Sequence, residues 1–179
     1  RLDGNMKKLA ALATVGVLAL TGCTTPSPTA AAYVGDTRIS QADVDTMAAA
    51  LAEVTDDPTD TGSAFAKPVV QFVIVSKLAR TGAEKAMIVV TDAQRAAVHA
   101  ANPSLATFAK NPALTTSISD LVDAQAILGT EAGHAAYAEQ VASTPVQVNP
   151  RIGVWDAKQG AFVDGGSGSI SSVAPLAQG

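Results

Sequence analysis

The sequence predicts a mainly α fold, a bundle of four to six helices that carries a small β-sheet. Two observations lead to this prediction. Hydrophobic residues make up 47% of the 179-residue chain but aromatic residues only 4%. Alanine, which loses no side-chain entropy in a helix, supplies much of the rest. Apolar residues also recur at spacings of three and four through the middle of the chain, which is the spacing of one helix face.

Residues 1–22 have the pattern of a secretory signal peptide. Two lysines follow Met6 and precede an uncharged apolar stretch over residues 9–20. A basic start, a short apolar core and a small-residue cleavage site are typical of such signals. The stretch is shorter than the roughly 20 apolar residues that cross a bilayer as a helix, so a permanent transmembrane anchor is disfavoured. Met6 is the expected start, and residues 1–5 are interpreted as an upstream extension.

The signal ends in Leu20-Thr21-Gly22-Cys23, which resembles the lipobox of bacterial lipoproteins. The resemblance implies cleavage before Cys23, a diacylglycerol on its sulfur, and a mature chain held at the outer face of the cytoplasmic membrane. Two acyl chains suit this role, because stable anchoring takes more than one chain. The alternative is an uncleaved or unlipidated signal with an incidental cysteine. Residues 24–31, rich in Thr, Ser and Pro, are expected to form a flexible tether.

Residues 32–163 are predicted to form one folded domain, followed by a flexible Gly/Ser-rich tail over residues 164–179. Apolar residues flank Gly35-Asp36, a pattern typical of a short strand or hairpin turn. Ser40, with an acidic residue three positions on, marks a helix start. The apolar residues of that helix share one face: Val44, Met47, Leu51 and Val54.

Four more helices follow by the same criteria. The first of them, residues 64–86, is apolar on more than one face, which is typical of a central, buried helix. Residues 88–90 are expected to connect into the core, because a capped helix starts at Thr91. Asn102-Pro103 ends that helix. The remaining predictions are helices over 92–101, 112–128 and 131–142, with Phe108 in a turn and Gly129 as a C-cap.

The last part of the domain has the pattern of strands. Val146 and Val148 alternate with polar residues, and residues 156–160 form a predicted hairpin loop. Arg151 and Trp155 flank a turn just before this loop. We expect them to pin the hairpin onto the bundle, since an arginine and an indole can form a cation–π pair.

Three segments of the domain resemble the SurA-type chaperone domain of exported foldases. Residues 34–44 (VGDTRISQADV) match its strand, tight turn, isoleucine and helix cap. Residues 88–92 (IVVTD) follow a long apolar helix, as in the family, which usually has glycine where this chain has Met87. Residues 148–156 (VNPRIGVWD) are similar to the C-terminal segment of SurA-like lipoproteins. Together the resemblance spans roughly residues 33–163.

The resemblance implies a helical bundle whose N-terminal strand pairs with a C-terminal strand, and a protein that holds unfolded exported chains. Complete SurA-like and PrsA-like foldases also carry a parvulin prolyl isomerase domain. Here the predicted helices run almost directly into Val146, which leaves no insertion of that size. His99 and His134 fall in different predicted helices, without the isomerase signature. We therefore expect no isomerase activity.

Composition and motifs indicate no catalytic, metal or cofactor site. The net charge of −4 argues against nucleic-acid binding, which needs a basic surface. Cys23 is the only cysteine, so the chain can form neither an internal disulfide nor a cysteine-based metal site. Residues 56–60 carry three aspartates, but proline interrupts them and no glutamate closes a calcium loop. We expect a solvated acidic loop there.

The leading hypothesis is a membrane-tethered, ATP-independent chaperone that binds unfolded or partly folded exported proteins. The second is a dedicated binding or assembly lipoprotein that docks one envelope partner, and the least favoured is a degenerate isomerase. Large flexible side chains suit promiscuous binding surfaces, although each could equally belong to an ordinary core. The candidate client-binding residues are Met47, Phe65, Phe72, Met87 and Phe108.

Overall fold

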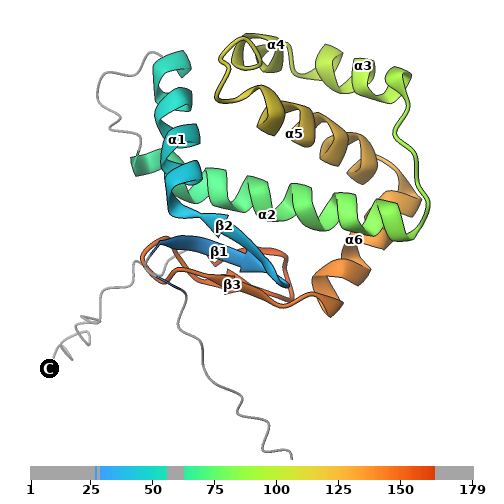
Figure 1. Ribbon diagram of the computed structural model, residues 1–179. Helices are drawn as coiled ribbons and strands as arrows, with labels where there is room; N and C mark the ends of the chain where they lie inside the picture. The colour runs from blue at the N-terminus through green and yellow to red at the C-terminus, as the bar shows by residue number, and fades with distance from the viewer. Residues whose placement is uncertain (1–26, 28, 56–62, 164–179) are drawn as a thin grey trace, which may run out of the picture.

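The computed structural model describes residues 27, 29–55 and 63–163, and it confirms the mainly α architecture (Figure 1). Six helices and two small antiparallel sheets make up this part of the chain. The strands are β1 (Ala30–Val34), β2 (Thr37–Ser40), β3 (Val146–Val148), β4 (Trp155–Asp156) and β5 (Ala161–Phe162). The helices are α1 (Gln41–Thr55), α2 (Ser63–Lys85), α3 (Asp92–Ala101), α4 (Ser104–Phe108), α5 (Thr115–Leu128) and α6 (Glu131–Ser143).

Several sequence predictions concern residues outside this described part. They are the signal peptide over residues 1–22, the lipidated Cys23, the acidic loop at 56–60 and the tail over 164–179. Half of the tether, residues 24–26 and 28, lies outside it as well.

The larger sheet joins the two ends of the described chain. Its strand order is β2-β1-β3, and both neighbouring pairs are antiparallel. Strand β1 pairs Ala32 with Val148 and Val34 with Val146. The N-terminal strand therefore lies directly beside a C-terminal strand, which confirms the expected pairing.

Strand β1 begins earlier than the sequence suggested. Ala30 and Ala31 were predicted to belong to the tether, but both lie in β1 and neither side chain is exposed. The boundary predicted after Ala31 therefore comes too late. A run of alanines has no alternation of apolar and polar residues, so the sequence does not separate tether from strand at this point.

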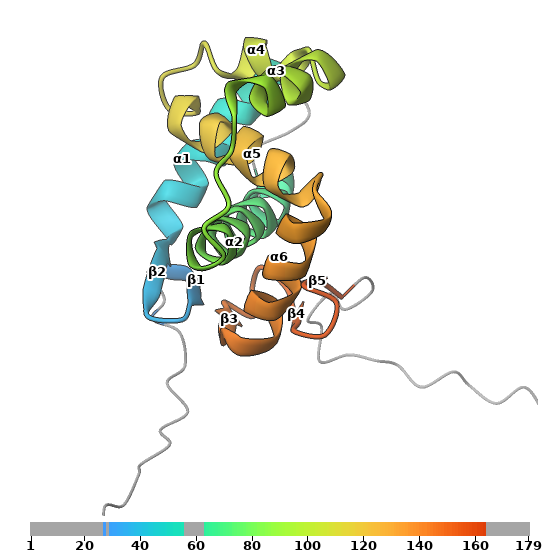
Figure 2. The ribbon, with the colours of Figure 1, turned by 90° about the vertical axis from the view of Figure 1, so that its right-hand side faces the viewer.

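Helix α2 is the central element, as its apolar pattern predicted. Figure 2 looks nearly along its axis, with β1 and β2 on one side and α6 on the other. Val70, Ile74 and Leu78 are almost fully buried in the cluster that includes the sheet. Ala79 and Ala83 belong to a second cluster with α5. A third cluster joins α1, α4 and α5.

The start of α3 is as predicted, and the start of α5 is not. Thr91 and Gln94 form a reciprocal capping box, in which the Thr91 backbone nitrogen lies 2.8 Å from Gln94 Oε1. Helix α5 begins at Thr115 rather than at Pro112. The side chain of Asn111 accepts the backbone N–H two residues on and so holds Pro112 in a turn.

Two connections also differ in detail from the sequence predictions. In the connector after α2, Ile88 and Val90 pack against the cluster of α2 and α5, but Val89 is 80% exposed. Only two of these three residues therefore pack against the core. Gly129 caps α5 as predicted, with a φ of −72° that any residue adopts. Phe108 lies at the end of the short helix α4 rather than in a simple turn.

The contact between α2 and α6 depends on a missing side chain. A Cβ atom at Gly82 would lie 2.7 Å from the carbonyl oxygen of Ala136. No flexible group can move aside there, because the obstructing atom belongs to the backbone. The close approach of these two helices therefore requires glycine at position 82.

We expect Gly82→Ala to lower the free energy of unfolding by about 1–3 kcal/mol, the usual cost of overpacking a core. Gly129→Ala is the matched control, because its Cβ would meet the nearest atom at 3.2 Å. Urea unfolding of both variants measures the difference. Equal stability of the two variants would contradict the close packing of α2 on α6.

Candidate functional site

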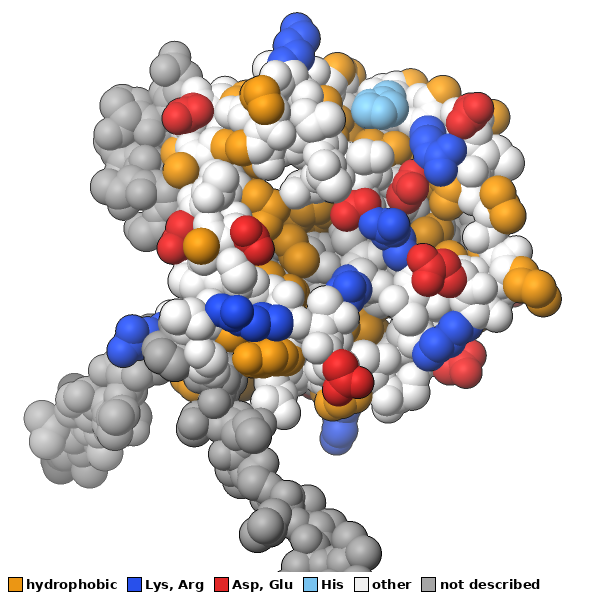
Figure 3. Space-filling view, viewed as in Figure 1, with side chains coloured by type: hydrophobic (Ala, Val, Ile, Leu, Met, Phe, Trp, Pro, Cys, Tyr) orange, Lys and Arg blue, Asp and Glu red, His pale blue; other side chains and the backbone are white. Residues whose placement is uncertain are grey.

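The candidate site is a hollow between β2, α1, α2 and α5, which we call the central groove. Its volume is about 400 Å³, within the range of roughly 300–1,000 Å³ that is usual for ligand pockets. Figure 3 shows this face of the molecule hollowed, with hydrophobic side chains inside and charged side chains of both signs around them. The apolar part of its lining consists of Ile39, Met47, Phe72 and Val73.

The groove brings together two of the candidate client-binding residues. Met47 reaches it from α1 and Phe72 from α2. Both side chains are half-buried, so part of each remains open to solvent. The Ser117 hydroxyl donates to Met47 Sδ at 2.9 Å and holds the thioether on the α5 side. These two residues give the groove an apolar surface that a partner can reach.

The other three candidates lie elsewhere. Phe65 packs, half-buried, against the cluster that includes the sheet. Phe108 packs in the same way against the cluster of α1, α4 and α5. Met87 stands on the loop after α2 and is 87% exposed. The five candidates therefore do not form one continuous surface in the described part of the chain.

Charged side chains around the groove are balanced in sign. The cations are Arg38, Lys77 and Arg80, and the anions are Asp43, Glu84 and Asp120. Arg80 of α2 and Asp120 of α5 form an ion pair across one side of the groove. A rim without net charge has no long-range preference for a polyanion or a polycation.

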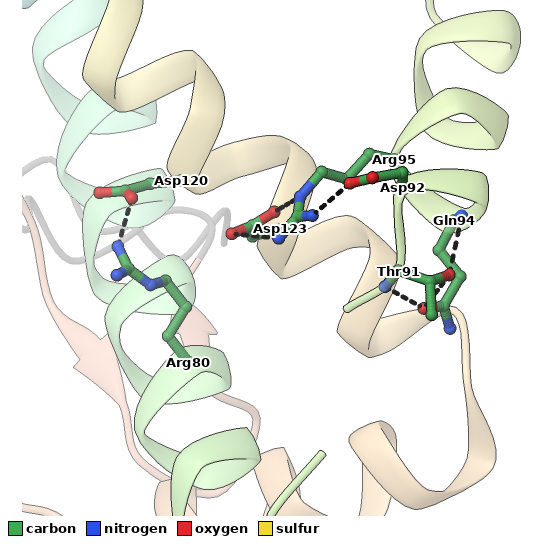
Figure 4. A network of polar contacts seen from close by, with 7 residues as sticks. All are labelled: Arg80, Thr91, Asp92, Gln94, Arg95, Asp120 and Asp123. Carbon is green, nitrogen blue, oxygen red and sulfur yellow. Dashed lines mark hydrogen bonds and ion pairs between the residues drawn. The ribbon is translucent and has the colours of Figure 1, made fainter. Parts of the chain in front are cut away.

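Helix α5 uses two acidic residues to join its neighbours (Figure 4). Asp120 pairs with Arg80 of α2, and Asp123 accepts the Nε–H of Arg95 of α3 at 2.7 Å. Arg95 also contacts Asp92 at 3.0 Å. The hydrogen bond that Arg95 donates to Asp123 is the main reason that the pKa of Arg95 is raised above its ordinary value. These half-exposed pairs orient α5 and contribute little to stability, about 0.2–1 kcal/mol each for such sites.

A buried hydroxyl in the groove lining has no partner. Ser76 of α2 is 4% exposed, and its Oγ forms no hydrogen bond with the described residues. Leaving such a group unpaired costs about 1–3 kcal/mol. Ser76 and Phe72 also line a second hollow of about 420 Å³ between α2 and α5. These two residues therefore lie between two hollows on the surface of α2.

The polar residues of the groove were not among the site residues predicted from the sequence. Ser76, Lys77 and Arg80 lie on a helix that was assigned from its apolar pattern alone. A signal was present, because Lys77, Thr81 and Glu84 follow spacings of four and three. Residues at those spacings share one helix face, so α2 carries a polar stripe beside its buried face.

The C-terminal hairpin is pinned by aromatic contacts other than the expected one. Trp155 packs edge-on against Phe162, with ring centroids 5.7 Å apart, and Lys67 Nζ lies 5.4 Å from the Phe162 ring. Trp155 and Phe162 face each other across the two strands of the hairpin, so their contact lies within it. Both also pack in the cluster that includes the sheet and α2, which attaches the hairpin to the bundle. Arg151 is exposed and takes no part in these aromatic contacts, so the expected role holds for Trp155 alone. Tyr137 of α6 lies nearby, and its burial raises the pKa of its hydroxyl.

The described residues contain no group of three His, Cys, Asp or Glu side chains that could hold a metal ion. His99 and His134 are both exposed, on α3 and α6. Among the helices of the described part, none is long and apolar enough to cross a membrane.

Met87 has an unusual backbone conformation. Its φ is +54°, in the left-handed region that disfavours residues with a side chain. The Ile88 N–H donates to the Ala83 carbonyl at 2.8 Å and the Met87 N–H to the Glu84 carbonyl at 3.2 Å, which is the bond pattern of a Schellman cap. The chain therefore forms the cap that usually takes glycine, but it places an exposed methionine there.

We expect Met87→Gly to raise the free energy of unfolding by about 1 kcal/mol, because glycine adopts positive φ without strain. The matched control is Val89→Gly, which shortens an equally exposed side chain on the same loop. The structure gives Val89 no positive φ, so this control should not gain stability. Urea unfolding measures both variants, and a less stable Met87→Gly protein would contradict the strain.

Comparisons of the chain with protein-family models, with curated proteins and with solved structures found no match.

Proposed function

We propose that this chain is a lipid-anchored protein of the cell envelope that holds unfolded exported proteins without ATP. The observation that carries the proposal is the central groove, a hollow open to solvent in which an apolar patch of four side chains is surrounded by polar and charged groups of balanced sign. Unfolded chains differ from folded ones mainly by their exposed apolar side chains. A site that takes such side chains, and has no preference for one charge, suits many different clients.

The lining of the groove also suits varied partners. Methionine has three rotatable bonds and a polarizable sulfur, so Met47 adapts to side chains of different shape. Phe72 adds a large aromatic surface beside it. The unpaired hydroxyl of Ser76 and the neighbouring second hollow indicate that this region has room to adjust. Each feature favours broad binding over a single precise fit.

The anchoring part of the proposal rests on the sequence. The lipobox-like segment ends at Cys23, seven positions before β1 begins at Ala30. The resemblance to SurA-type domains agrees with the paired N- and C-terminal strands of this fold. An acyl anchor on Cys23 would keep the domain close to the outer face of the cytoplasmic membrane, where exported chains emerge.

We further propose that the protein is not an enzyme. Helix α6 ends at Ser143 and β3 begins at Val146, so no further domain is inserted between them. The histidines are exposed on separate helices. This arrangement gives no support to the degenerate-isomerase hypothesis.

The second candidate is a lipoprotein that docks one folded partner of the envelope. One observation favours it: Met87 and Val89 stand exposed on the same loop, away from the central groove. A strained, exposed residue is sometimes retained for a binding role. Saturable binding of a single partner, lost in Met87→Gly, would support this candidate over the first.

The groove is tested by aggregation suppression with the chain that begins at Thr24, using several unrelated unfolded clients. We expect suppression by the native sequence and at least a tenfold loss in Met47→Gln/Phe72→Gln. Burying one large apolar side chain contributes about 1.5–3 kcal/mol, and this variant removes two. Val154→Ser is the matched control, because Val154 is 58% exposed and lies outside the groove lining.

Circular dichroism shows whether each of these variants is folded. Suppression of no client by the native sequence would contradict the proposed function. If the groove variant and Val154→Ser suppress aggregation equally, clients bind outside the groove.

The anchor is tested by Cys23→Ser in the complete chain. We expect the variant to lose incorporation of labelled fatty acid and to leave the membrane fraction, because serine lacks the sulfur that forms the thioether. A variant that stays in the membrane fraction, while the native chain takes up no label, would show that the protein is held by other means.

A further inference from the structure

One edge of the larger sheet is open. Strand β2 has a single neighbour, β1, in the described part of the chain. An unpaired strand edge presents backbone N–H and C=O groups that can pair with another extended chain.

The bonds to β3 identify the outward groups. The Asn149 N–H donates to the Ala31 carbonyl and the Gly35 N–H to the Pro145 carbonyl, each at 2.8 Å. The odd-numbered residues of β1 therefore face β3, and the even-numbered ones face β2. In an antiparallel pair, residues opposite each other alternate between bonded and unbonded. Arg38 lies opposite Tyr33 and is unbonded to it, so the backbone N–H and C=O of Arg38 point away from β1.

This open edge borders the central groove. Thr37, Arg38 and Ile39 of β2 all line the groove, opposite Val73 and Lys77 of α2. A chain paired with β2 would therefore run along the mouth of the groove. Because side chains of a strand alternate between its two faces, every second one would be directed toward the apolar lining.

The charges indicate the kind of chain that fits. Three cations and three anions surround the groove, and Arg80 and Asp120 already neutralise each other. This balance matches a segment without net charge and gives no attraction for an anionic lipid surface or a nucleic acid. The complementary occupant is an uncharged, extended polypeptide with an apolar residue at alternate positions.

We propose that clients bind as an added strand on the outer edge of β2, with alternate side chains in the central groove. This inference rests on the proposed function, and it specifies the conformation in which a client is held. Backbone bonds are the same for every sequence, while the groove selects only for apolar side chains. The combination accounts for binding that is broad but restricted to unfolded chains.

Two substitutions at one position test the inference. Arg38→Pro removes the outward N–H, and Arg38→Ala keeps it; both remove the bonds from the guanidinium to Thr29. Proline is tolerated where the N–H faces away from the neighbouring strand, and it keeps the preceding residue extended. The probe is a fluorescent, uncharged eight-residue peptide of alternating leucine and serine, with anisotropy measured on the full chain in mild detergent. We expect Arg38→Pro to bind at least tenfold more weakly than Arg38→Ala.

A second measurement needs no change in the protein. Two further probes carry N-methyl groups, one on the leucines and the other on the serines. A strand added to one edge directs the N–H groups of alternate residues toward that edge. We expect one methylated probe to bind the native chain at least tenfold more weakly than the other. This comparison decides the question if Arg38→Pro fails to fold.

The outcomes separate this inference from the proposed function. Equal binding by the two Arg38 variants, together with equal binding of the two methylated probes, overturns the added strand. If client aggregation is still suppressed through Met47 and Phe72 in that case, the proposed function stands. Absence of binding by the plain probe also overturns the inference, and absence of suppression for every client overturns the proposed function.

Discussion

The burial of α2 between the sheet and the helices α5 and α6 is the packing on which the rest of the structure depends. Val70, Ile74 and Leu78 fill the space above the sheet, and Gly82 allows α6 to approach on the other side. The side of α2 that stays open to solvent combines the half-buried Phe72 and Val73 with a polar stripe, and it lies opposite β2 across the groove. The groove therefore forms where the solvent-facing side of the central helix lies opposite β2.

Local signals in the sequence were enough to predict much of the fold. The limits of α3 follow from the capping box at Thr91 and from Asn102-Pro103, both of which act within a few residues. The predicted start of α5 at Pro112 was wrong. The side chain of Asn111 accepts the backbone N–H of Ala113, and this turn holds Pro112 outside the helix. The candidate site was harder to predict than the fold, because only tertiary packing brings β2 and the polar stripe of α2 together. Met47 and Phe72 were found as side-chain types, but their shared location was not visible in the sequence.

The backbone conformation of Met87 costs stability without a gain in packing. Glycine would satisfy the same cap with less strain, and the exposed thioether makes no contribution to any of the hydrophobic clusters. A residue that is costly and unburied has no structural explanation within the described part of the chain. Strain of this kind is a reason to look for a role in binding, which is why its loop remains the basis of the second candidate function.

The size of the groove bears on why an anchor would matter. A hollow of about 400 Å³ has room for only a few side chains. Each buried side chain contributes about 1.5–3 kcal/mol, while association costs an estimated 4–15 kcal/mol in lost freedom and ordering. The surplus is small, so under the proposed function capture by the groove alone would be weak and quickly reversible. An anchor at the membrane would raise the local concentration of the groove near emerging chains, and weak, repeated contacts there would then be sufficient.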